Sequence, residues 1–341
     1  MSELPITTEP LPSGCELAPE QPLAAVVEQV SRSRHPLWLV RRQGEVRALL
    51  DSELRSAVQD RPLATLTVWD VARRALIAAD PTAAHEQLTA WPQLEGVLVA
   101  APEPVVVRRV PPRIDTAVVM AGGLGQRLRP MTDTTPKPLL EVAGEPLLGR
   151  ILRHLAAHGV RKVWLSVNYL KERIRAYAAA GDRWGLEIAY LEESQPLDTG
   201  AGLAQMPRGE RPFFVVNGDV LTDVNLSALG RQHLLRRAVA TVATYLYPAP
   251  LPYGVVHRDG ERITGIEEKP VLRYPINAGI YAFAAKIQQQ VVPGAPLSMV
   301  PFLNQRIASG DQIDRFPLVE YWNDVGQPAD FERAQQDAKR L

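Results

Sequence analysis

A glycine-rich segment directly after a short apolar run constrains this fold more than any other part of the chain. The apolar run covers residues 116–120 and predicts a fully buried strand of a parallel sheet. The next ten residues read Ala121-Gly-Gly-Leu-Gly-Gln-Arg-Leu-Arg-Pro130. Three glycines in four positions allow a sharp turn and a close approach of bare N–H groups to a ligand, which suits a phosphate.

Two cations accompany this loop. Arg127 supplies a planar guanidinium fork, and Lys137, in Thr-Pro-Lys-Pro, supplies a compact point charge. A dinucleotide fingerprint is excluded because Leu128 stands where its third glycine belongs, and a P-loop is excluded because no Gly-Lys-Ser/Thr follows. The segment therefore predicts a loop that binds a nucleotide triphosphate, and the alternative is a tight turn with surface charges.

The charge balance limits the classes of partner. Lys plus Arg and Asp plus Glu number 38 each, so no net field attracts nucleic acid or an anionic membrane. The single cysteine, Cys15, excludes an internal disulfide framework and a cysteine-based zinc site. Because the sequence shows neither a signal peptide nor an apolar run of about 20 residues, we expect a cytoplasmic protein without membrane or nucleic-acid partners.

The 341 residues predict two domains after an N-terminal arm. Residues 1–22 are rich in Pro and acidic side chains and predict a flexible arm. Residues 23–110 predict a smaller α+β domain, with a hairpin of 36–40 and 46–50, a helix over 69–79 that Pro81 ends, and a strand over 96–100. The stiff stretch 108–113 predicts the boundary before a domain over 111–341.

Strands and helices alternate in the second domain. Pro146 and Gly159 bracket one predicted helix, residues 170–180 form another, and strands are expected at 163–167, 186–190 and 212–216. This alternation predicts an α/β fold with an open, mostly parallel, Rossmann-like sheet covered by helices on both faces. Ligands of such sheets bind beyond the carboxyl ends of the strands, where the glycine loop and Asn217-Gly-Asp219 fall.

Two carboxylates are candidates for a metal site. Asp219 follows a buried strand directly, and Asp324 precedes a glycine turn and a helix that Pro328 begins. Carboxylates are hard oxygen ligands of the kind that Mg²⁺ uses together with substrate phosphates. The alternative for Asp219 is a turn-capping role, since Asn-Gly-Asp is turn chemistry.

Other polar and small residues could complete a substrate site. Lys269, in Glu-Glu-Lys-Pro, is placed to bind the phosphate of an acceptor, although most lysines are merely solvated. Asn277 precedes a buried strand, and Tyr253-Gly254 offers a place where a ring could approach the backbone. The turn over 196–202 could lie against a base or ribose, or it could begin a helix at Ala201.

Six motifs in the C-terminal region together resemble one family. Gly-Gly-x-Gly-x-Arg-Leu-x-Pro with Pro-Lys-Pro, Asn-Gly-Asp, Tyr-Gly-Val-Val, Glu-Glu-Lys-Pro, Asn-Ala-Gly-Ile-Tyr and Trp-x-Asp-Val-Gly occur in this order. The set resembles the sugar-1-phosphate nucleotidyltransferases from about residue 114 to the C-terminus. The chain departs from the family pattern at Gln126, where Thr is commoner, and at Asp198, which replaces a glycine of the second turn.

This resemblance implies roles for individual residues. Arg127, Lys137, Asp219 and Lys269 would be catalytic, and Asp219 and Asp324 would hold Mg²⁺. The nucleotide would be bound by Ala121, Gly122, Gly123, Gly125, Glu193, Thr199 and Gly200. The sugar phosphate would be bound by Tyr253, Gly254, Glu268, Lys269 and Asn277.

The N-terminal domain resembles a degenerate CBS-type module. Residues 44–55 resemble the end of such a motif, but Glu53 stands where a ribose-binding Asp is expected and Leu50 where a Thr is expected. We therefore expect a structural or dimerising domain, which could form a homo-oligomer, rather than a ligand sensor. We also expect it to be separable, so that the chain without residues 1–110 stays folded and active.

The expected reaction joins an NTP and a sugar 1-phosphate into an NDP-sugar and pyrophosphate, as in nucleotide-sugar biosynthesis for surface polysaccharide. Glu192 or Glu193 could accept from both N1–H and the exocyclic amine of guanine, which favours GTP. The alternatives are a uridylyltransferase acting on a MurNAc- or GlcNAc-type 1-phosphate, and a non-catalytic nucleotide-sugar sensor. An NAD-dependent oxidoreductase is disfavoured by Leu128 and Pro130.

Overall fold

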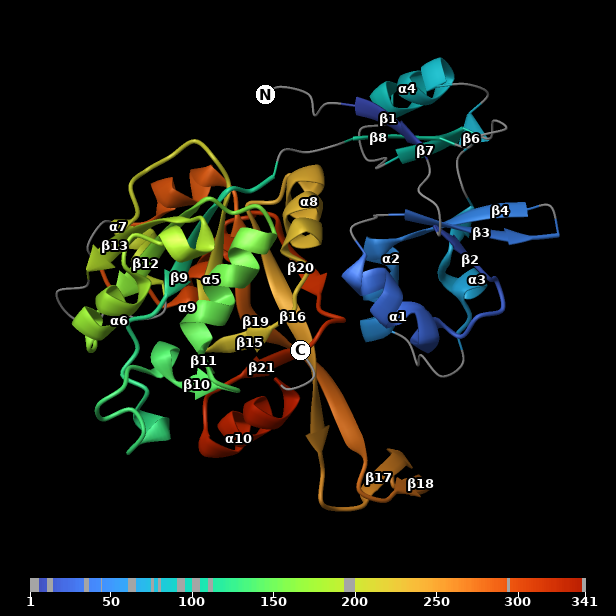
Figure 1. The fold of residues 1–341 in the computed structure, drawn as a ribbon. Coiled ribbons are helices and arrows are strands. Elements are labelled where there is room, and N and C mark those ends of the chain that lie inside the picture. The colour runs from blue at the N-terminus through green and yellow to red at the C-terminus, as the bar shows by residue number, and fades with distance from the viewer. Residues whose placement is uncertain are drawn as a thin grey trace.

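The computed structural model describes most of the chain as two parts that lie side by side (Figure 1). The described residues are 6–10, 15–33, 37–43, 45–60, 66–74, 77–78, 81–90, 96–99, 105–109, 113–192, 200–292 and 295–338. Glu193 and Thr199 lie outside these residues, so the structure says nothing of their predicted contacts with a nucleotide.

A seven-stranded sheet forms the centre of the larger part, in the order β13-β12-β9-β14-β19-β16-β20. Its strands are β9 (Thr116–Met120), β12 (Lys162–Val167), β13 (Glu187–Glu192), β14 (Phe213–Asn217), β16 (Ala240–Pro250), β19 (Val271–Phe283) and β20 (Ile313–Pro317). All neighbours are parallel except β19, which is antiparallel to both β14 and β16. The prediction of an α/β fold with a mostly parallel sheet is confirmed.

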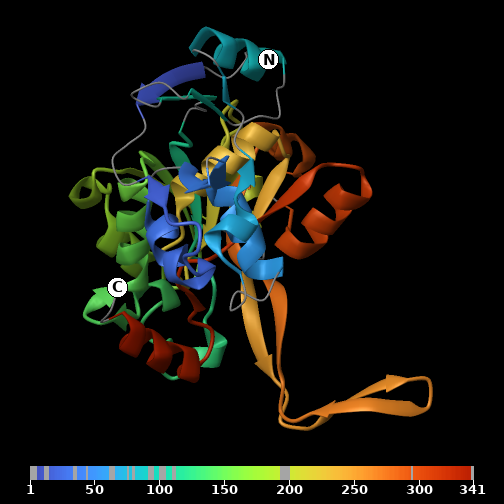
Figure 2. The same ribbon diagram turned by 90° about the vertical axis from the view of Figure 1, so that its right-hand side faces the viewer.

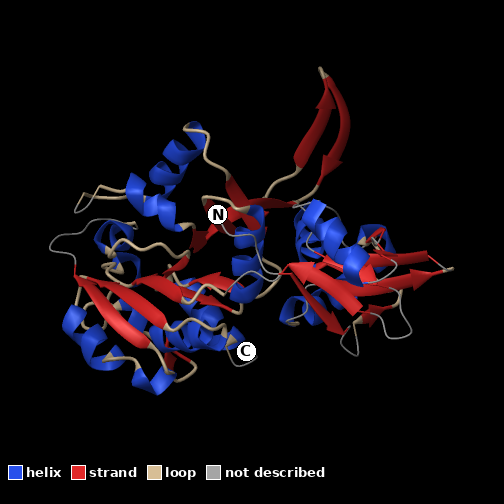
Figure 3. Ribbon diagram, turned by 90° about the horizontal axis from the view of Figure 1, so that it is seen from above, coloured by secondary structure: helices blue, strands red, loops and turns tan. Residues whose placement is uncertain are grey.

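Helices cover both faces of this sheet (Figure 3). They are α5 (Leu147–Ala157), α6 (Lys171–Ala178), α7 (Ala201–Gln205), α8 (Leu226–Arg236), α9 (Met299–Ala308) and α10 (Pro328–Asp337). Side chains alternate between two cores along β9, since Ala117 and Val119 belong to one and Val118 to the other. Within the described residues, no helix has the length and apolar character that a membrane crossing requires.

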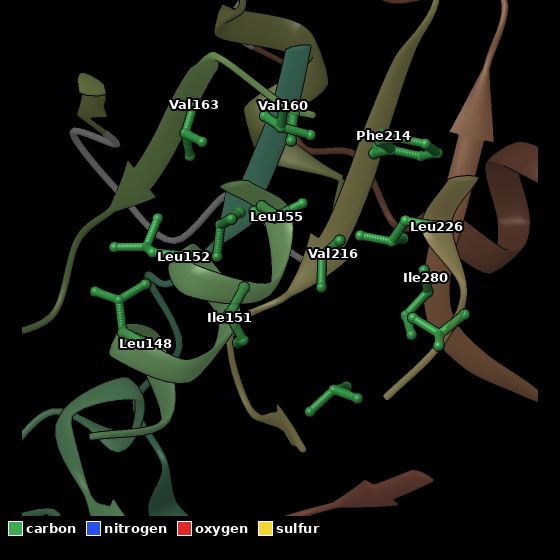
Figure 4. Packing of buried hydrophobic residues seen from close by; sticks show 14 of the residues in the cluster. Leu148, Ile151, Leu152, Leu155, Val160, Val163, Phe214, Val216, Leu226 and Ile280 are labelled. Atoms are coloured by element: carbon green, nitrogen blue, oxygen red, sulfur yellow. The ribbon is translucent and has the colours of Figure 1, made fainter. Parts of the chain in front are cut away.

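Helix α5 shows how the sequence pattern builds the core. Leu148, Ile151, Leu152 and Leu155 share one side of the helix and pack toward the sheet (Figure 4). Pro146 precedes the first turn, and Gly159 adopts a left-handed φ of 91° just after the last turn. The helix predicted between Pro146 and Gly159 is confirmed.

Strands β16 and β19 continue beyond the sheet into a projecting arm (Figures 1 and 2). Its end is the hairpin of β17 (Val255–Asp259) and β18 (Arg262–Glu267). Two shorter ladders lie nearer the sheet: β10 (Glu141–Val142) pairs with β11 (Glu145–Pro146), and β15 (Val220–Thr222) pairs with β21 (Trp322–Asp324). Short 3₁₀ segments occur at Gln126–Leu128, Lys137–Leu139, Asp182–Trp184 and Ala285–Gln290.

The described residues of the N-terminal part form two four-stranded sheets, in the orders β1-β8-β7-β6 and β2-β3-β4-β5. The first consists of β1 (Ile6–Pro10), β6 (Ile77–Ala78), β7 (Gly96–Val99) and β8 (Val105–Arg109), and the second of β2 (Glu16–Leu17), β3 (Leu37–Arg42), β4 (Glu45–Leu50) and β5 (Arg73–Arg74). The helices are α1 (Leu23–Arg32), α2 (Asp51–Asp60), α3 (Val68–Val71) and α4 (Pro81–Ala90). The β3–β4 hairpin and strand β7 confirm two predictions, whereas the CBS-like assignment stays a prediction.

Three predictions for this part are wrong. The segment 1–22 is not simply an arm, because β1 pairs with β8 and the apolar side chains of Cys15 and Leu17 are buried in the domain core. The helix over 69–79 is absent: α3 ends at Val71, and β5 pairs with β4 instead. Pro81 begins α4 rather than ending a helix, since proline fits the first helical position.

The stretch 108–113 also differs from its prediction. Arg108 and Arg109 belong to β8, where they pair with Gly96 and with Ile6. Only residues after Arg109 can therefore form the predicted break, and 110–112 lie outside the described residues. The division into domains near residue 110 stays a prediction.

Candidate functional site

The glycine loop and Asp219 meet because β9 and β14 are neighbouring parallel strands. The N–H of Gly218 donates to the carbonyl of Met120 at 2.9 Å. A Cβ on residue 218 would lie only 2.6 Å from that carbonyl oxygen, so the close approach requires a glycine. As predicted from the strand pattern, both segments lie at the carboxyl ends of their strands.

Asp324 comes to the same place through the short ladder of β15 and β21. This ladder pairs Val220 with Asp324, so the residue that precedes β15 and the last residue of β21 are adjacent. The N–H of Val325 also donates to the carbonyl of Asp219 at 3.1 Å. The structure therefore brings together the two carboxylates that the sequence singled out.

Lys137 joins the two carboxylates. Its Nζ donates to Oδ2 of Asp219 at 2.5 Å and lies 3.9 Å from Oδ1 of Asp324. The lysine is 8% exposed, so this shared cation acts where the solvent screens charge poorly. Its positive charge offsets the repulsion between the two carboxylates.

Arg127 lies close to Asp324. A Cβ built on Gly326 would lie 3.4 Å from both Nη2 of Arg127 and Oδ2 of Asp324, so the two charged groups border the same glycine. The neighbouring Leu128 is fully buried and anchors the turn that carries Arg127. We call Arg127, Lys137, Asp219 and Asp324 the charged cluster.

The carboxyl group of Asp324 has a raised pKa and one oxygen without a hydrogen-bond partner. Burial, followed by the charge of Asp219, raises the pKa of Asp324, while Lys137 and Arg127 oppose this shift. Its Oδ1 atom is buried and accepts no hydrogen bond, although the rest of the carboxyl group is partly exposed. An unsatisfied carboxylate oxygen beside a second carboxylate suits a hard divalent cation. Among the described residues no three His, Cys, Asp or Glu side chains gather around one point, so a divalent cation here would need further oxygen ligands of another kind.

The glycines of the loop have different constraints. Gly125 has a φ of 61°, and a Cβ there would lie 2.9 Å from Cγ2 of Thr132 and 3.2 Å from Cβ of Lys137. Gly123 faces open space, since a Cβ added there would have no other atom within 4 Å. The N–H of Ala121 is already bonded to the carbonyl of Ser166 at 2.8 Å, so it is not available to a nucleotide.

Thr132 is a site residue that the sequence did not reveal. It is 1% exposed, and its hydroxyl donates to the carbonyl of Gly125 at 2.9 Å, which fixes the end of the glycine loop. Its local sequence, Met-Thr-Asp-Thr, carries no pattern that distinguishes a buried threonine from a surface one. Only the close packing against Gly125 identifies it.

The second glycine turn has a structural role. Gly200 donates to the carbonyl of Leu297 at 2.6 Å and leaves no room there for a side chain. It precedes α7, so the turn does begin a helix at Ala201, which was one of the two alternatives.

Glu192 pairs with Lys171 at 2.8 Å and with Arg175, and these contacts lower its pKa. This carboxylate is thus occupied by protein cations.

Four of the predicted sugar-phosphate residues lie on the arm that Figure 2 shows: Tyr253, Gly254, Glu268 and Lys269. Tyr253 is 76% exposed, and Glu268 lies next to Gly254, where an added Cβ would be 3.1 Å from Oε2 of Glu268. Lys269 follows at the same bend with a positive φ of 48°. Asn277 lies on β19, where its amide donates to the Tyr281 hydroxyl and accepts from the N–H of Gly279.

Comparison with known proteins agrees with this geometry. The nucleotidyl transferase family model matches residues 116–340, which contain the whole charged cluster. Mannose-1-phosphate guanyltransferase of Yarrowia lipolytica is 35% identical over 223 residues, covering 63% of this chain and 61% of the relative. Mannose-1-phosphate guanylyltransferase of Mycobacterium tuberculosis is 36% identical over 236 residues, covering 66% and 64%. The chain spans about three fifths of the length of these curated relatives.

Solved structures share the fold. HddC from Yersinia pseudotuberculosis has a TM-score of 0.52 at 23% identity, covering 66% of this chain and all of HddC. A protein from Bacillus anthracis assigned as a glucose-1-phosphate thymidylyltransferase has a TM-score of 0.56 at 20% identity, covering 66% of this chain and 96% of its own. Since the family model covers most of the chain, including every residue of the charged cluster, the protein belongs to the nucleotidyl transferase family.

Proposed function

We propose that the protein transfers a nucleotidyl group from an NTP, with GTP favoured, to a sugar 1-phosphate and releases pyrophosphate. The observation that carries this proposal is the charged cluster at the carboxyl ends of β9 and β14, beside the glycine loop. Membership of the nucleotidyl transferase family supports the reaction, and the guanylyltransferase relatives support GTP. The product would be a nucleotide-sugar for surface polysaccharide or a related glycan.

The chemistry needs charge compensation more than a general base. The second pKa of a phosphate monoester is about 6, so the acceptor is largely dianionic at neutral pH. One of its oxygens attacks the α-phosphorus, the bond from that phosphorus to the bridging oxygen breaks, and pyrophosphate leaves with the electron pair. Arg127 and Lys137 offset the repulsion between dianion and triphosphate and hold the reacting groups in line.

We assign a magnesium ion to Asp219 and Asp324. Enzymes of this family generally use a divalent metal, and the buried, unsatisfied Oδ1 of Asp324 fits such an ion. When bound, the ion would supply positive charge to the phosphate oxygens. Lys137 lies within reach of both carboxylates, so it would keep part of their charge compensated whether or not the metal is bound.

A panel of NTPs and sugar 1-phosphates tests the reaction. Pyrophosphate release is measured with GTP, UTP, ATP, CTP and dTTP against the 1-phosphates of mannose, glucose and N-acetylglucosamine. The highest kcat/KM with GTP is expected, with mannose 1-phosphate as the first acceptor to try because of the relatives' names. The highest value with UTP would identify a uridylyltransferase, and nucleotide-sugar binding without any release would identify a sensor.

Two glycine variants test whether a nucleotide occupies the loop. Gly125→Ala is expected to lower the melting temperature, because a left-handed alanine costs about 1–2 kcal/mol and its Cβ would meet Thr132. Gly123→Ala faces open space, so it should keep the melting temperature and weaken GTP binding only. Calorimetry and a GTP titration measure both effects. Unchanged GTP affinity in Gly123→Ala would place the nucleotide elsewhere.

Lys269→Ala tests the assignment of the arm to the acceptor. Loss of one charge-assisted hydrogen bond, about 1.5–3 kcal/mol, should raise the KM for the sugar phosphate about 10-fold to 100-fold and leave the KM for GTP nearly unchanged. Lys286→Ala, an exposed lysine on the body of the domain, is the matched control. A rise in the KM for GTP instead would assign Lys269 to the triphosphate.

A further inference from the structure

The N-terminal part inserts one arginine into the larger part, which holds the seven-stranded sheet. Helix α2 lies against β20 (Figure 1), and Arg55 of this helix is fully buried at the contact. Its Nη1 donates to Oε2 of Glu320 at 2.7 Å and its Nη2 to Oε1 at 2.6 Å. The guanidinium also lies 4.3 Å from the centre of the Phe316 ring. This two-point contact with a carboxylate is a geometry that only arginine provides.

Arg55 lies between two carboxylates, and a second arginine balances the charge, since Nη2 of Arg231 lies 4.0 Å from Oδ2 of Asp51. Its Nε donates to Oδ2 of Asp51 at 2.9 Å, and the side chain of Glu320 is only 3% exposed. Burial alone would lower the pKa of Arg55, but the charges of Asp51 and Glu320 outweigh it and raise that pKa. Removing one partner of such a buried pair leaves an uncompensated charge and is strongly unfavourable.

Glu320 also belongs to the frame that holds the catalytic carboxylates. Its Oε1 accepts a second hydrogen bond from the N–H of Asn225, which follows β15. The next residue, Tyr321, accepts from the hydroxyl of Thr222 at 2.8 Å and from the N–H of Asp223 at 3.2 Å. The Arg55–Glu320 pair therefore joins the two chain segments that leave one end of the β15–β21 ladder.

The other end of this ladder carries the charged cluster. The register pairs Thr222 with Trp322 at the end near Glu320 and Val220 with Asp324 at the end near the cluster. A ladder of three residues is about 10 Å long, since a strand rises about 3.3 Å per residue. A displacement of Glu320 can thus reach Asp219 and Asp324 along the chain and through the hydrogen bonds of the ladder.

We propose that Arg55 is a positioning residue, which holds the ladder of β15 and β21 so that Asp219 and Asp324 keep their separation. The proposal rests on the proposed function for its effect on turnover, but not for its effect on the ladder. It gives the N-terminal part a catalytic purpose: docking of α2 completes the support of the two carboxylates.

A conservative variant and a matched control separate positioning from general stability. Arg55→Lys keeps the positive charge but cannot make the two-point contact with Glu320. Arg315→Ala removes another ion pair across the same interface, from Nη2 of Arg315 to Asp60 at 2.5 Å, which is half exposed and does not touch the ladder. Both variants are made in the full chain.

Two readouts are compared. Amide hydrogen exchange of peptides 219–225 and 320–326 should be faster in Arg55→Lys than in the wild type and unchanged in Arg315→Ala. The kcat for pyrophosphate release should fall about 10-fold or more in Arg55→Lys, as a small misplacement of catalytic groups does, with both KM values within about 2-fold. The kcat of Arg315→Ala should equal that of the wild type.

The outcomes distinguish this inference from the proposed function. Unchanged exchange at the two peptides in Arg55→Lys, or an equal change in Arg315→Ala, overturns the positioning role. Faster exchange with unchanged kcat overturns it as well, because the ladder would then loosen without consequence. If the wild type releases no pyrophosphate with any substrate pair, the proposed function fails, while the exchange comparison still decides whether Arg55 holds the ladder.

Discussion

Asp219→Asn is expected to reduce pyrophosphate release about 10²-fold to 10³-fold, which is the size of effect seen when one group that stabilises transition-state charge is removed. Asparagine keeps the shape of the side chain but loses its charge. It would therefore weaken both the proposed metal contact and the 2.5 Å contact with Lys137. The measurement is the initial rate at saturating GTP, sugar phosphate and Mg²⁺, accompanied by a melting curve.

The control for this variant is a second aspartate in an ordinary ion pair. Asp311 pairs with Arg306 at 3.6 Å, outside the charged cluster, so Asp311→Asn should keep full activity. The side chain of Asp219 is 28% exposed, and backbone hydrogen bonds hold the chain in place around it. Removing its charge should therefore change the melting temperature little. Asp219→Asn activity within a few-fold of the wild type would show that this carboxylate holds no metal.

The charged cluster could be predicted because its signals are local. A buried strand followed by small or acidic residues places those residues at the carboxyl end of a sheet, and β9 and β14 both follow this rule. The structure brings Asp219 and Asp324 together, as the sequence predicts, and their shared role as metal ligands stays a prediction. The hydrogen-bonded ladder that joins them, β15 with β21, has only three residues per strand and too short a pattern to be recognised.

The remaining features depend on contacts between distant segments. Arg55 and Glu320 are 265 positions apart, and the residues next to each of them in the sequence do not indicate that it is buried. The helix expected over 69–79 does not form, for a similar reason. Arg73 and Arg74 pair with Ala48 and Arg47 of β4, a strand that lies more than 20 residues earlier in the chain. The projection of the arm likewise depends on the length to which β16 and β19 continue their pairing.

Removal of residues 1–112 is expected to produce an aggregating fragment with little activity, which reverses the expectation from the sequence alone. Strand β20 is an edge of the seven-stranded sheet, and α2 lies against it. Phe316 of this strand is fully buried beneath Arg55, and the side chain of Gln59 donates to the carbonyl of Thr244 on the next strand. Without α2, the side chain of Phe316 and the unpaired backbone groups of the edge strand β20 become exposed. Such a surface promotes association between chains.

The decisive measurement compares residues 113–341 with the full chain by mass in solution and by kcat/KM. A separately expressed fragment of residues 1–112, added during refolding, should restore both, because the contacts at Arg55 and Gln59 need proximity rather than a covalent link. Glu320 would become solvated in the fragment, so the loss should come from exposed surface and a loosened ladder rather than from a stranded buried charge. A monodisperse fragment with the kcat/KM of the full chain would mean that α2 covers β20 without supporting it, and that the two parts are independent, as expected from the sequence alone.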